Sequence, residues 1–174
     1  HDIAAIYSQP DRNSGRGRNK TATPVKAFAL QNELPVFTPK GLRNNVEELE
    51  RLTELKADAF VVVAYGRILP VEILQVPPMG VVNIHPSLLP KYRGPSPVVT
   101  AILEGEDTAG VTIMLLDEGM DTGPILAQST PMWLSGTEKG AALQSALFKE
   151  GASMLPNVLK GLQEGSLTPR PQDD

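Results

Sequence analysis

The stretch that decides the fold is FVVVAYGRILPVEILQVPPMGVVNIHP, residues 60–86. Its first five residues are apolar at every position, which is typical of a central parallel strand covered on both faces. A second short run, Val81 to His85, ends where Pro86 interrupts the strand pattern. Outside this stretch, further strands are predicted at residues 3–7, 111–116 and 125–130.

Segments with helical signals lie between these apolar runs. Thr23-Pro24 and Ser96-Pro97 each place a capping residue before a proline at the first helical position. Residues 46–55 carry one apolar stripe at helical spacing. The alternation of strands and helices predicts the α/β class, with a Rossmann-like, open, mostly parallel twisted sheet flanked by helices.

The C-terminal part should form one long helix after Thr137, with a break suggested by Gly151 and Pro156. We expect residues 1–164 to form one catalytic domain that is incomplete at its N-terminus, because the chain begins in a strand-like stretch without an initiator Met. Residues 165–174 contain two prolines and terminal acids, and we expect a linker toward an absent C-terminal domain.

Composition narrows the function classes. With 41% hydrophobic residues in 174, the chain can bury a core without disulfides. The absence of cysteine excludes thiolate chemistry and fits a reducing cytoplasm, and two histidines offer no zinc constellation, so we expect no metal. No apolar run reaches the roughly 18 residues of a membrane span. We expect a cytoplasmic monomer whose net charge of −4 requires any nucleic-acid contact to use a local basic patch.

Three polar residues are candidates for chemistry. Asn83 and His85 are two apart at the end of a strand, so both side chains lie on one face, where open α/β sheets bind ligands. Asp121 lies in a glycine-punctuated turn within GVTIMLLDEGMDTGPIL, residues 110–126. Taken singly, none of the three is specific: a lone strand histidine or asparagine is more often a hydrogen-bonded structural residue, and Asp is a common turn former.

The local basic patch lies in QPDRNSGRGRNKTATPVK, residues 9–26, where Asp11 is the only acid. Its candidate cations are Arg12, Arg16, Arg18 and Lys20. Several such charges can bind phosphates, although a solvated loop has the same composition. The GRGR motif lacks the full dinucleotide-binding spacing.

The strings NIHPSLLPKYRG, residues 83–94, and DEGMDTG, residues 117–123, together closely resemble the folate-dependent formyltransferases. The resemblance covers nearly the whole chain. It implies the formyltransferase fold and catalytic roles for Asn83, His85 and Asp121.

RGPSP, residues 93–97, and the basic loop are similar to the tRNA-modifying branch of this family. This likeness implies formyl transfer from the co-substrate 10-formyltetrahydrofolate to the α-amino group of initiator methionyl-tRNA, with the basic loop on the acceptor stem. One alternative is a small amine acceptor such as glycinamide ribonucleotide or an amino sugar. Another is a non-catalytic folate- or RNA-binding module.

The resemblance also implies a folate pocket with two walls. One wall lies in AYGRILP, residues 64–70, and the other in the SLLP segment. The candidate folate contacts are Arg67, Ile68, Leu69, Ser87, Leu88, Leu89 and Pro90. Hydrophobicity does not separate folate contact from core packing at the leucines and Ile68.

The implied reaction suggests how the three polar residues divide the work. The formyl oxygen gains negative charge during attack, and the leaving folate nitrogen must gain a proton. We expect Asn83 and a protonated His85 to donate hydrogen bonds to that oxygen. His85 then relays the proton, and Asp121 favours the charged imidazole.

Overall fold

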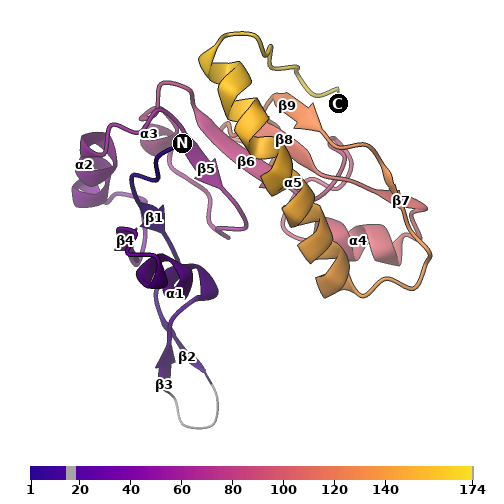
Figure 1. Cartoon of the computed structure of the whole chain (residues 1–174), viewed down its shortest axis with the longest axis horizontal. Helices are drawn as coiled ribbons and strands as arrows, with labels where there is room; N and C mark the ends of the chain where they lie inside the picture. Colours follow the sequence, from indigo (N-terminus) through magenta and orange to yellow (C-terminus); the bar gives the residue numbers. More distant parts are fainter. Residues whose placement is uncertain (15–18, 174) are drawn as a thin grey trace. The chain divides into compact units, whose positions relative to one another are not determined.

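The computed structural model of the chain describes residues 1–14 and 19–173, and it divides into two compact units (Figure 1). The N-terminal unit comprises residues 1–57 and the C-terminal unit residues 58–174. The expected division into a catalytic domain at 1–164 and a linker at 165–174 stays a prediction.

The N-terminal unit combines short strands and two helices. Strand β1 (Ile6–Tyr7) pairs in parallel with β4 (Val36–Phe37), and β2 (Arg12–Ser14) forms an antiparallel hairpin with β3 (Asn19–Thr21). Its helices are α1 (Pro24–Gln31) and α2 (Val46–Glu54).

Both helices of this unit begin at capping side chains. Thr23 Oγ1 accepts from the Lys26 amide at 3.1 Å, as the Thr-Pro signal predicted. Asn45 Oδ1 accepts from the Glu48 amide at 3.2 Å. Each cap satisfies an amide that the first helical turn leaves without a partner.

The C-terminal unit is built on a four-stranded sheet in the order β5-β6-β8-β9. Its strands are β5 (Phe60–Val62), β6 (Val81–His85), β8 (Thr112–Leu115) and β9 (Ile125–Gln128). β5 and β6 run parallel, whereas β6 with β8 and β8 with β9 run antiparallel. The α/β class is confirmed, and the sheet of this unit is mixed.

The remaining elements of this unit flank that sheet. They are α3 (Val71–Leu74), α4 (Pro97–Leu103), β7 (Thr108–Ala109), β10 (Met132–Trp133) and α5 (Gly140–Gln163). β7 and β10 form a separate antiparallel pair. No helix in the described part of the chain combines the length and apolarity needed to cross a bilayer.

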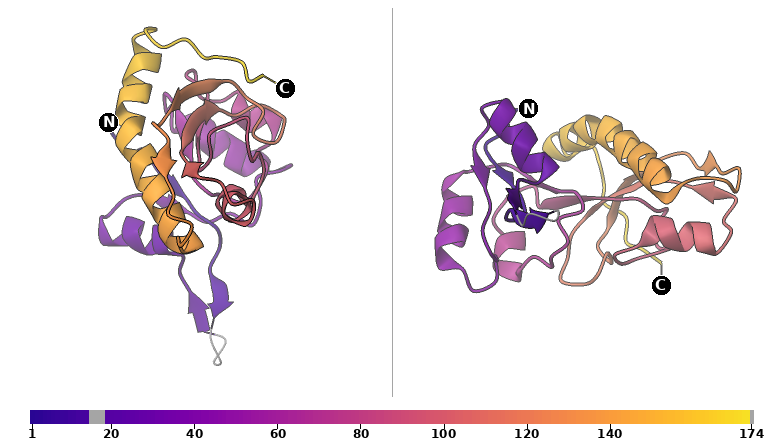
Figure 2. Two further views of the ribbon diagram at one scale, coloured as in Figure 1. Left: turned by 90° about the vertical axis from the view of Figure 1, so that its right-hand side faces the viewer. Right: turned by 90° about the horizontal axis from the view of Figure 1, so that it is seen from below.

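The predicted break in the last helix is wrong, because α5 runs without interruption past Gly151 and Pro156 (Figure 2). A Cβ at Gly151 would lie 2.4 Å from Ile84 Cγ2 and 3.1 Å from Val111 Cγ2. The glycine therefore allows the helix to pack closely on the sheet. We attribute the tolerance of Pro156 to the apolar burial of α5, which offsets the hydrogen bond that proline removes.

All five residues of β6 are buried. Val82 and Ile84 belong to the core cluster that includes Val158 of α5. Because strand side chains alternate between faces, Asn83 and His85 point to the opposite face of the sheet. The packing of α5 thus fixes which face carries the polar residues.

Candidate active site

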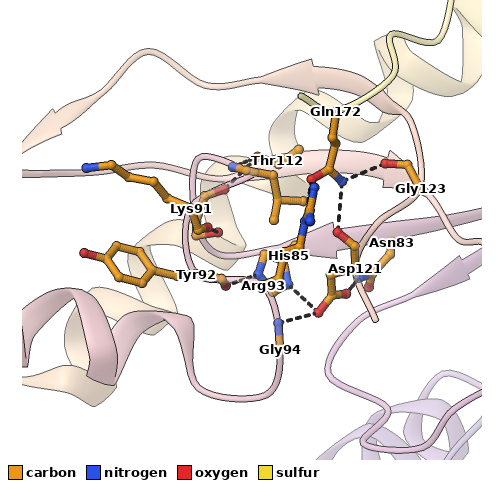
Figure 3. A network of polar contacts seen from close by, with 12 residues as sticks. Asn83, His85, Lys91, Tyr92, Arg93, Gly94, Thr112, Asp121, Gly123 and Gln172 are labelled. Atoms are coloured by element: carbon orange, nitrogen blue, oxygen red, sulfur yellow. Dashed lines mark hydrogen bonds and ion pairs between the residues drawn. The ribbon is translucent and has the colours of Figure 1, made fainter. Parts of the chain in front are cut away.

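Asn83, His85 and Asp121 converge at the carboxyl end of β6 (Figure 3). Asn83 Nδ2 donates to Asp121 Oδ1 at 3.3 Å, and His85 Nδ1 lies 3.6 Å from Asp121 Oδ2. The Gly94 amide donates to the same Oδ2 at 2.9 Å. The structure therefore brings the three predicted residues together, although Asp121 is far from β6 in the sequence.

The turn that carries Asp121 is held by its own side chains. Asp117 accepts hydrogen bonds from the Gly119 amide at 3.0 Å and from Thr122 Oγ1 at 2.8 Å. Asp121 adopts a left-handed backbone conformation with φ of 54°, which aspartate tolerates better than most residues. At Gly123 a Cβ would lie 2.0 Å from the Leu115 carbonyl oxygen, so this position requires glycine.

His85 lies between two acceptors. Its Nε2 is 2.9 Å from the Tyr92 carbonyl oxygen, which can only accept, so Nε2 carries a hydrogen. Its Nδ1 faces the Asp121 carboxylate, and the two side chains are only 5% and 15% exposed. One ring nitrogen of His85 is therefore hydrogen-bonded to a backbone carbonyl, and the other faces a carboxylate.

The loop that supplies the Tyr92 carbonyl is anchored at the surface. Tyr92 Oη donates to Glu106 Oε1 at 2.6 Å, and Lys91 Nζ donates to the same oxygen at 2.8 Å. The hydrogen bond to the Glu106 carboxylate raises the pKa of Tyr92 to about 12. The hydrogen bonds from Lys91 and Tyr92 in turn lower the pKa of Glu106.

A cavity of about 580 Å³ lies beside these polar side chains. Asn83, His85 and Asp121 line it together with the expected first wall of the folate pocket, Arg67, Ile68 and Leu69. The volume lies within the range of small-molecule sites, and further apolar lining comes from Val62, Leu74, Val99, Leu116 and Phe148. The lining thus combines apolar side chains with the polar Asn83, His85 and Asp121.

The expected second wall, Ser87 to Pro90, is not part of the lining of this cavity. Ser87 and Leu88 line a smaller cavity of about 160 Å³, and Leu89 is buried beside Met114. Ser87 Oγ donates to the Lys91 carbonyl at 2.7 Å. The segment is therefore part of the loop that follows β6 and lies outside the lining of the larger cavity.

The structure also shows site contacts that the sequence did not indicate. They are the Gly94 amide on Asp121, the Tyr92 carbonyl on His85, and Gln172, whose side chain donates to the carbonyl oxygens of Asp121 and Gly123. Nearly every residue has a backbone amide and a carbonyl, so the sequence does not show which of them contact His85 and Asp121. Gln172 lies in a proline-containing tail whose composition is typical of a linker.

The basic patch is described only in part. Arg12 lies on β2 and Lys20 on β3, whereas Arg16 and Arg18 lie outside the described residues. Lys26 Nζ pairs with Asp11 at 2.8 Å, which neutralises the single acid of this stretch. Among the residues described, no group of three or more His, Cys, Asp or Glu could hold a metal ion.

Comparisons with known proteins show the family to which the chain belongs. The formyl transferase family model matches residues 1–159. The chain is 49% identical over 173 residues to a methionyl-tRNA formyltransferase of Chloroflexus aurantiacus and 50% identical over 173 residues to one of Roseiflexus sp. strain RS-1. Each match covers 99% of this chain and 55% or 53% of the relative, so the chain spans about half their length.

Among solved structures, a glycinamide ribonucleotide transformylase 1 from Symbiobacterium toebii superposes with a TM-score of 0.74 at 25% identity. That match covers 88% of this chain and 77% of the other. The expected formyltransferase fold is therefore confirmed. Because the family model matches most of the chain, the chain belongs to the formyl transferase family.

Proposed function

We propose that this chain transfers a formyl group from 10-formyltetrahydrofolate to the α-amino group of initiator methionyl-tRNA. The observation that carries the proposal is the convergence of Asn83, His85 and Asp121 on the wall of one cavity. The methionyl-tRNA formyltransferases that are 49% and 50% identical to the chain over 173 aligned residues support the choice of acceptor. We also propose that the reaction takes place in the cytoplasm.

We propose that the folate co-substrate binds in this cavity, whose volume of about 580 Å³ lies within the range of small-molecule sites. Ile68 and Leu69 offer apolar surface for an aromatic ring, and Arg67 brings a guanidinium that suits carboxylates. We assign Ser87 and Leu89 a supporting role, because Thr112 Oγ1 donates to the Ser87 carbonyl at 2.6 Å and accepts from the Leu89 amide at 3.1 Å. Thr112 is the strand partner of His85, so this network holds the loop beside the site.

Each polar side chain has a distinct role in the proposed transfer. Asn83 uses one amide hydrogen on Asp121 and offers the second to the formyl oxygen as that oxygen gains negative charge. The 3.6 Å from His85 Nδ1 to Asp121 exceeds a normal hydrogen bond, so this N–H can donate to the substrate instead. His85 then supplies the proton that the departing nitrogen requires, and the proton released by the attacking α-amino group restores His85.

In the proposed transfer, the Asp121 carboxylate orients the His85 ring and stabilises positive charge on it, and it also fixes the Asn83 amide. The attacking α-amino group titrates near pH 8, so a substantial neutral fraction is present at working pH without a strong base. None of these roles requires a metal ion. Loss of Asn83, His85 or Asp121 should therefore slow transfer more than it weakens folate binding.

The β2-β3 hairpin is our proposed tRNA contact. Arg12 and Lys20 lie on its paired strands, and Arg16 and Arg18 complete the basic set in the sequence. Contact with phosphates releases counterions, so tRNA binding should weaken steeply as salt is raised. A small amine acceptor would not need these cations.

The second candidate function is formyl transfer to a small amine, favoured by the fold shared with a glycinamide ribonucleotide transformylase. The test compares methionyl-tRNA and glycinamide ribonucleotide as acceptors for wild type and for the double variant Arg12→Glu and Lys20→Glu. We expect wild type to formylate methionyl-tRNA and the variant to lose this activity. Lys149→Glu, an exposed change of the same sign on α5, serves as the control. Formylation of glycinamide ribonucleotide alone, unaffected by the double variant, would establish the second function instead.

A further inference from the structure

The side-chain amide of Gln172 ties together the two loops that hold the polar site (Figure 3). Its Nε2 donates to the Asp121 carbonyl at 2.9 Å and to the Gly123 carbonyl at 2.7 Å. Its Oε1 accepts from Arg93 Nε at 3.0 Å. Both amide hydrogens and the amide oxygen are therefore engaged, and all three partners lie in loops beside the cavity.

The backbone before Gln172 is fixed on the C-terminal unit. Leu167 packs against the core cluster beneath α5. Arg170 and Ile125 form an antiparallel bridge in which the two amide-to-carbonyl distances are 2.7 and 2.8 Å. This bridge aligns the tail with the start of β9, directly after the turn that carries Asp121. The pairing of Arg170 with Ile125 therefore positions Gln172 beside the turn that carries Asp121.

The contacts of Gln172 form a closed ring around Asp121. The Asp121 carbonyl accepts from Gln172, while its carboxylate accepts from the Gly94 amide at 2.9 Å. Arg93 directly precedes Gly94 and donates to Gln172. Asp121 is thus held at both its backbone and its side chain. The ring thus joins the Asp121 backbone to the loop whose Gly94 amide contacts the Asp121 carboxylate.

We infer that Gln172 is a positioning residue for Asp121, an inference that rests on the proposed formyl transfer. Its role is to donate two hydrogen bonds that set the Asp121 turn, so that the carboxylate faces His85 and Asn83. A glutamate at this position has nearly the same size and keeps an acceptor for Arg93. Its carboxylate cannot donate, however, and it lies against two carbonyl oxygens that repel it. Gln172→Glu therefore separates the donor role from simple packing.

The kinetic test compares wild type, Gln172→Glu and Gln172→Ala in formyl transfer from 10-formyltetrahydrofolate to methionyl-tRNA. We expect kcat to fall on the order of tenfold or more, since small displacements of catalytic groups are costly, while KM for the folate stays within about twofold. Gln163→Glu introduces the same charge at an exposed position at the end of α5 and should leave kcat unchanged. A variant that merely lowers the melting temperature, with wild-type kcat per folded molecule, would overturn the inference.

A second measurement does not depend on activity. The Gly94 amide hydrogen bonds to Asp121, so its hydrogen exchange, followed by NMR, reports the position of the carboxylate. We expect faster Gly94 exchange in Gln172→Glu and wild-type exchange in Gln163→Glu. Unchanged Gly94 exchange in Gln172→Glu would refute the positioning role, whatever the kinetics show. Inactivity of the wild-type chain would count against the proposed function, and the exchange comparison would still decide the role of Gln172.

Discussion

Replacing Asp121 by asparagine isolates the charge of the proposed catalytic carboxylate. Asparagine has nearly the same shape and tolerates the left-handed backbone that Asp121 adopts at φ of 54°. The turn should therefore keep its conformation. An alanine at this position would add backbone strain to the loss of charge, so Asp121→Asn is the cleaner variant.

The expected size of the effect follows from the 3.6 Å between His85 Nδ1 and Asp121 Oδ2. Two unit charges at this distance attract by about 4.6 kcal/mol at an effective dielectric constant of about 20. That energy corresponds to a little over three powers of ten in rate, at roughly 1.36 kcal/mol for each tenfold change. Asparagine retains one acceptor for Asn83 or Gly94, so we expect a loss of about 100-fold to 1000-fold.

The assay is single-turnover transfer of a labelled formyl group from 10-formyltetrahydrofolate, with folate binding measured on the same samples. Asp107→Asn removes an equal charge from an exposed position and should leave the rate unchanged. If Asp121→Asn transferred the formyl group within about tenfold of the wild-type rate, the carboxylate would not act on His85 as described.

Asn83→Ala should lower turnover on the order of 100-fold with little change in folate binding, and an equal loss of binding would contradict its role as an oxyanion donor. Gly151→Ala should lower the free energy of unfolding by about 1–3 kcal/mol, because the added Cβ would overlap Ile84. Urea unfolding measures this loss, and an unchanged midpoint urea concentration would contradict the packing described for α5. The Glu106 hydrogen bond raises the pKa of Tyr92 from 10.0 to about 12, so the folded state retains this proton longer than the unfolded state. Between these pH values, the free energy of unfolding of wild type should fall with rising pH more steeply than that of Tyr92→Phe, as measured by urea unfolding at each pH. The same pH dependence in both proteins would contradict the role of this hydrogen bond.

The elements that sequence predicted best are those in which local signals agree. Residues Val81–His85 form β6 as predicted, because an apolar run ends at a proline. The Thr-Pro and Ser-Pro pairs likewise mark the starts of α1 and α4. Asn83 and His85 share one face because of strand geometry, and their meeting with Asp121 was expected from the family resemblance.

Long-range features were not predictable from local patterns. The pattern of apolar residues shows where a strand lies but not in which direction it runs in the sheet. The antiparallel pairing of β8 with β6 could therefore not be inferred. The continuity of α5 depends on close packing at Gly151, which a residue-by-residue preference for helix breaking cannot include. Gln172 reaches Asp121 across 51 residues of sequence, and nothing in the tail marks a contact. In each case, tertiary packing outweighs local propensity.

The most direct test of the proposed reacting centre measures formyl transfer and folate binding together in His85→Ala. Wild type and variant are each mixed with 10-formyltetrahydrofolate and methionyl-tRNA, and formyl transfer is followed in a single turnover while folate binding is titrated. We predict that the variant binds the folate as wild type does and transfers the formyl group at least about 100-fold more slowly. Near-native transfer by a variant that still binds the folate would show that Asn83, His85 and Asp121 do not form the reacting centre.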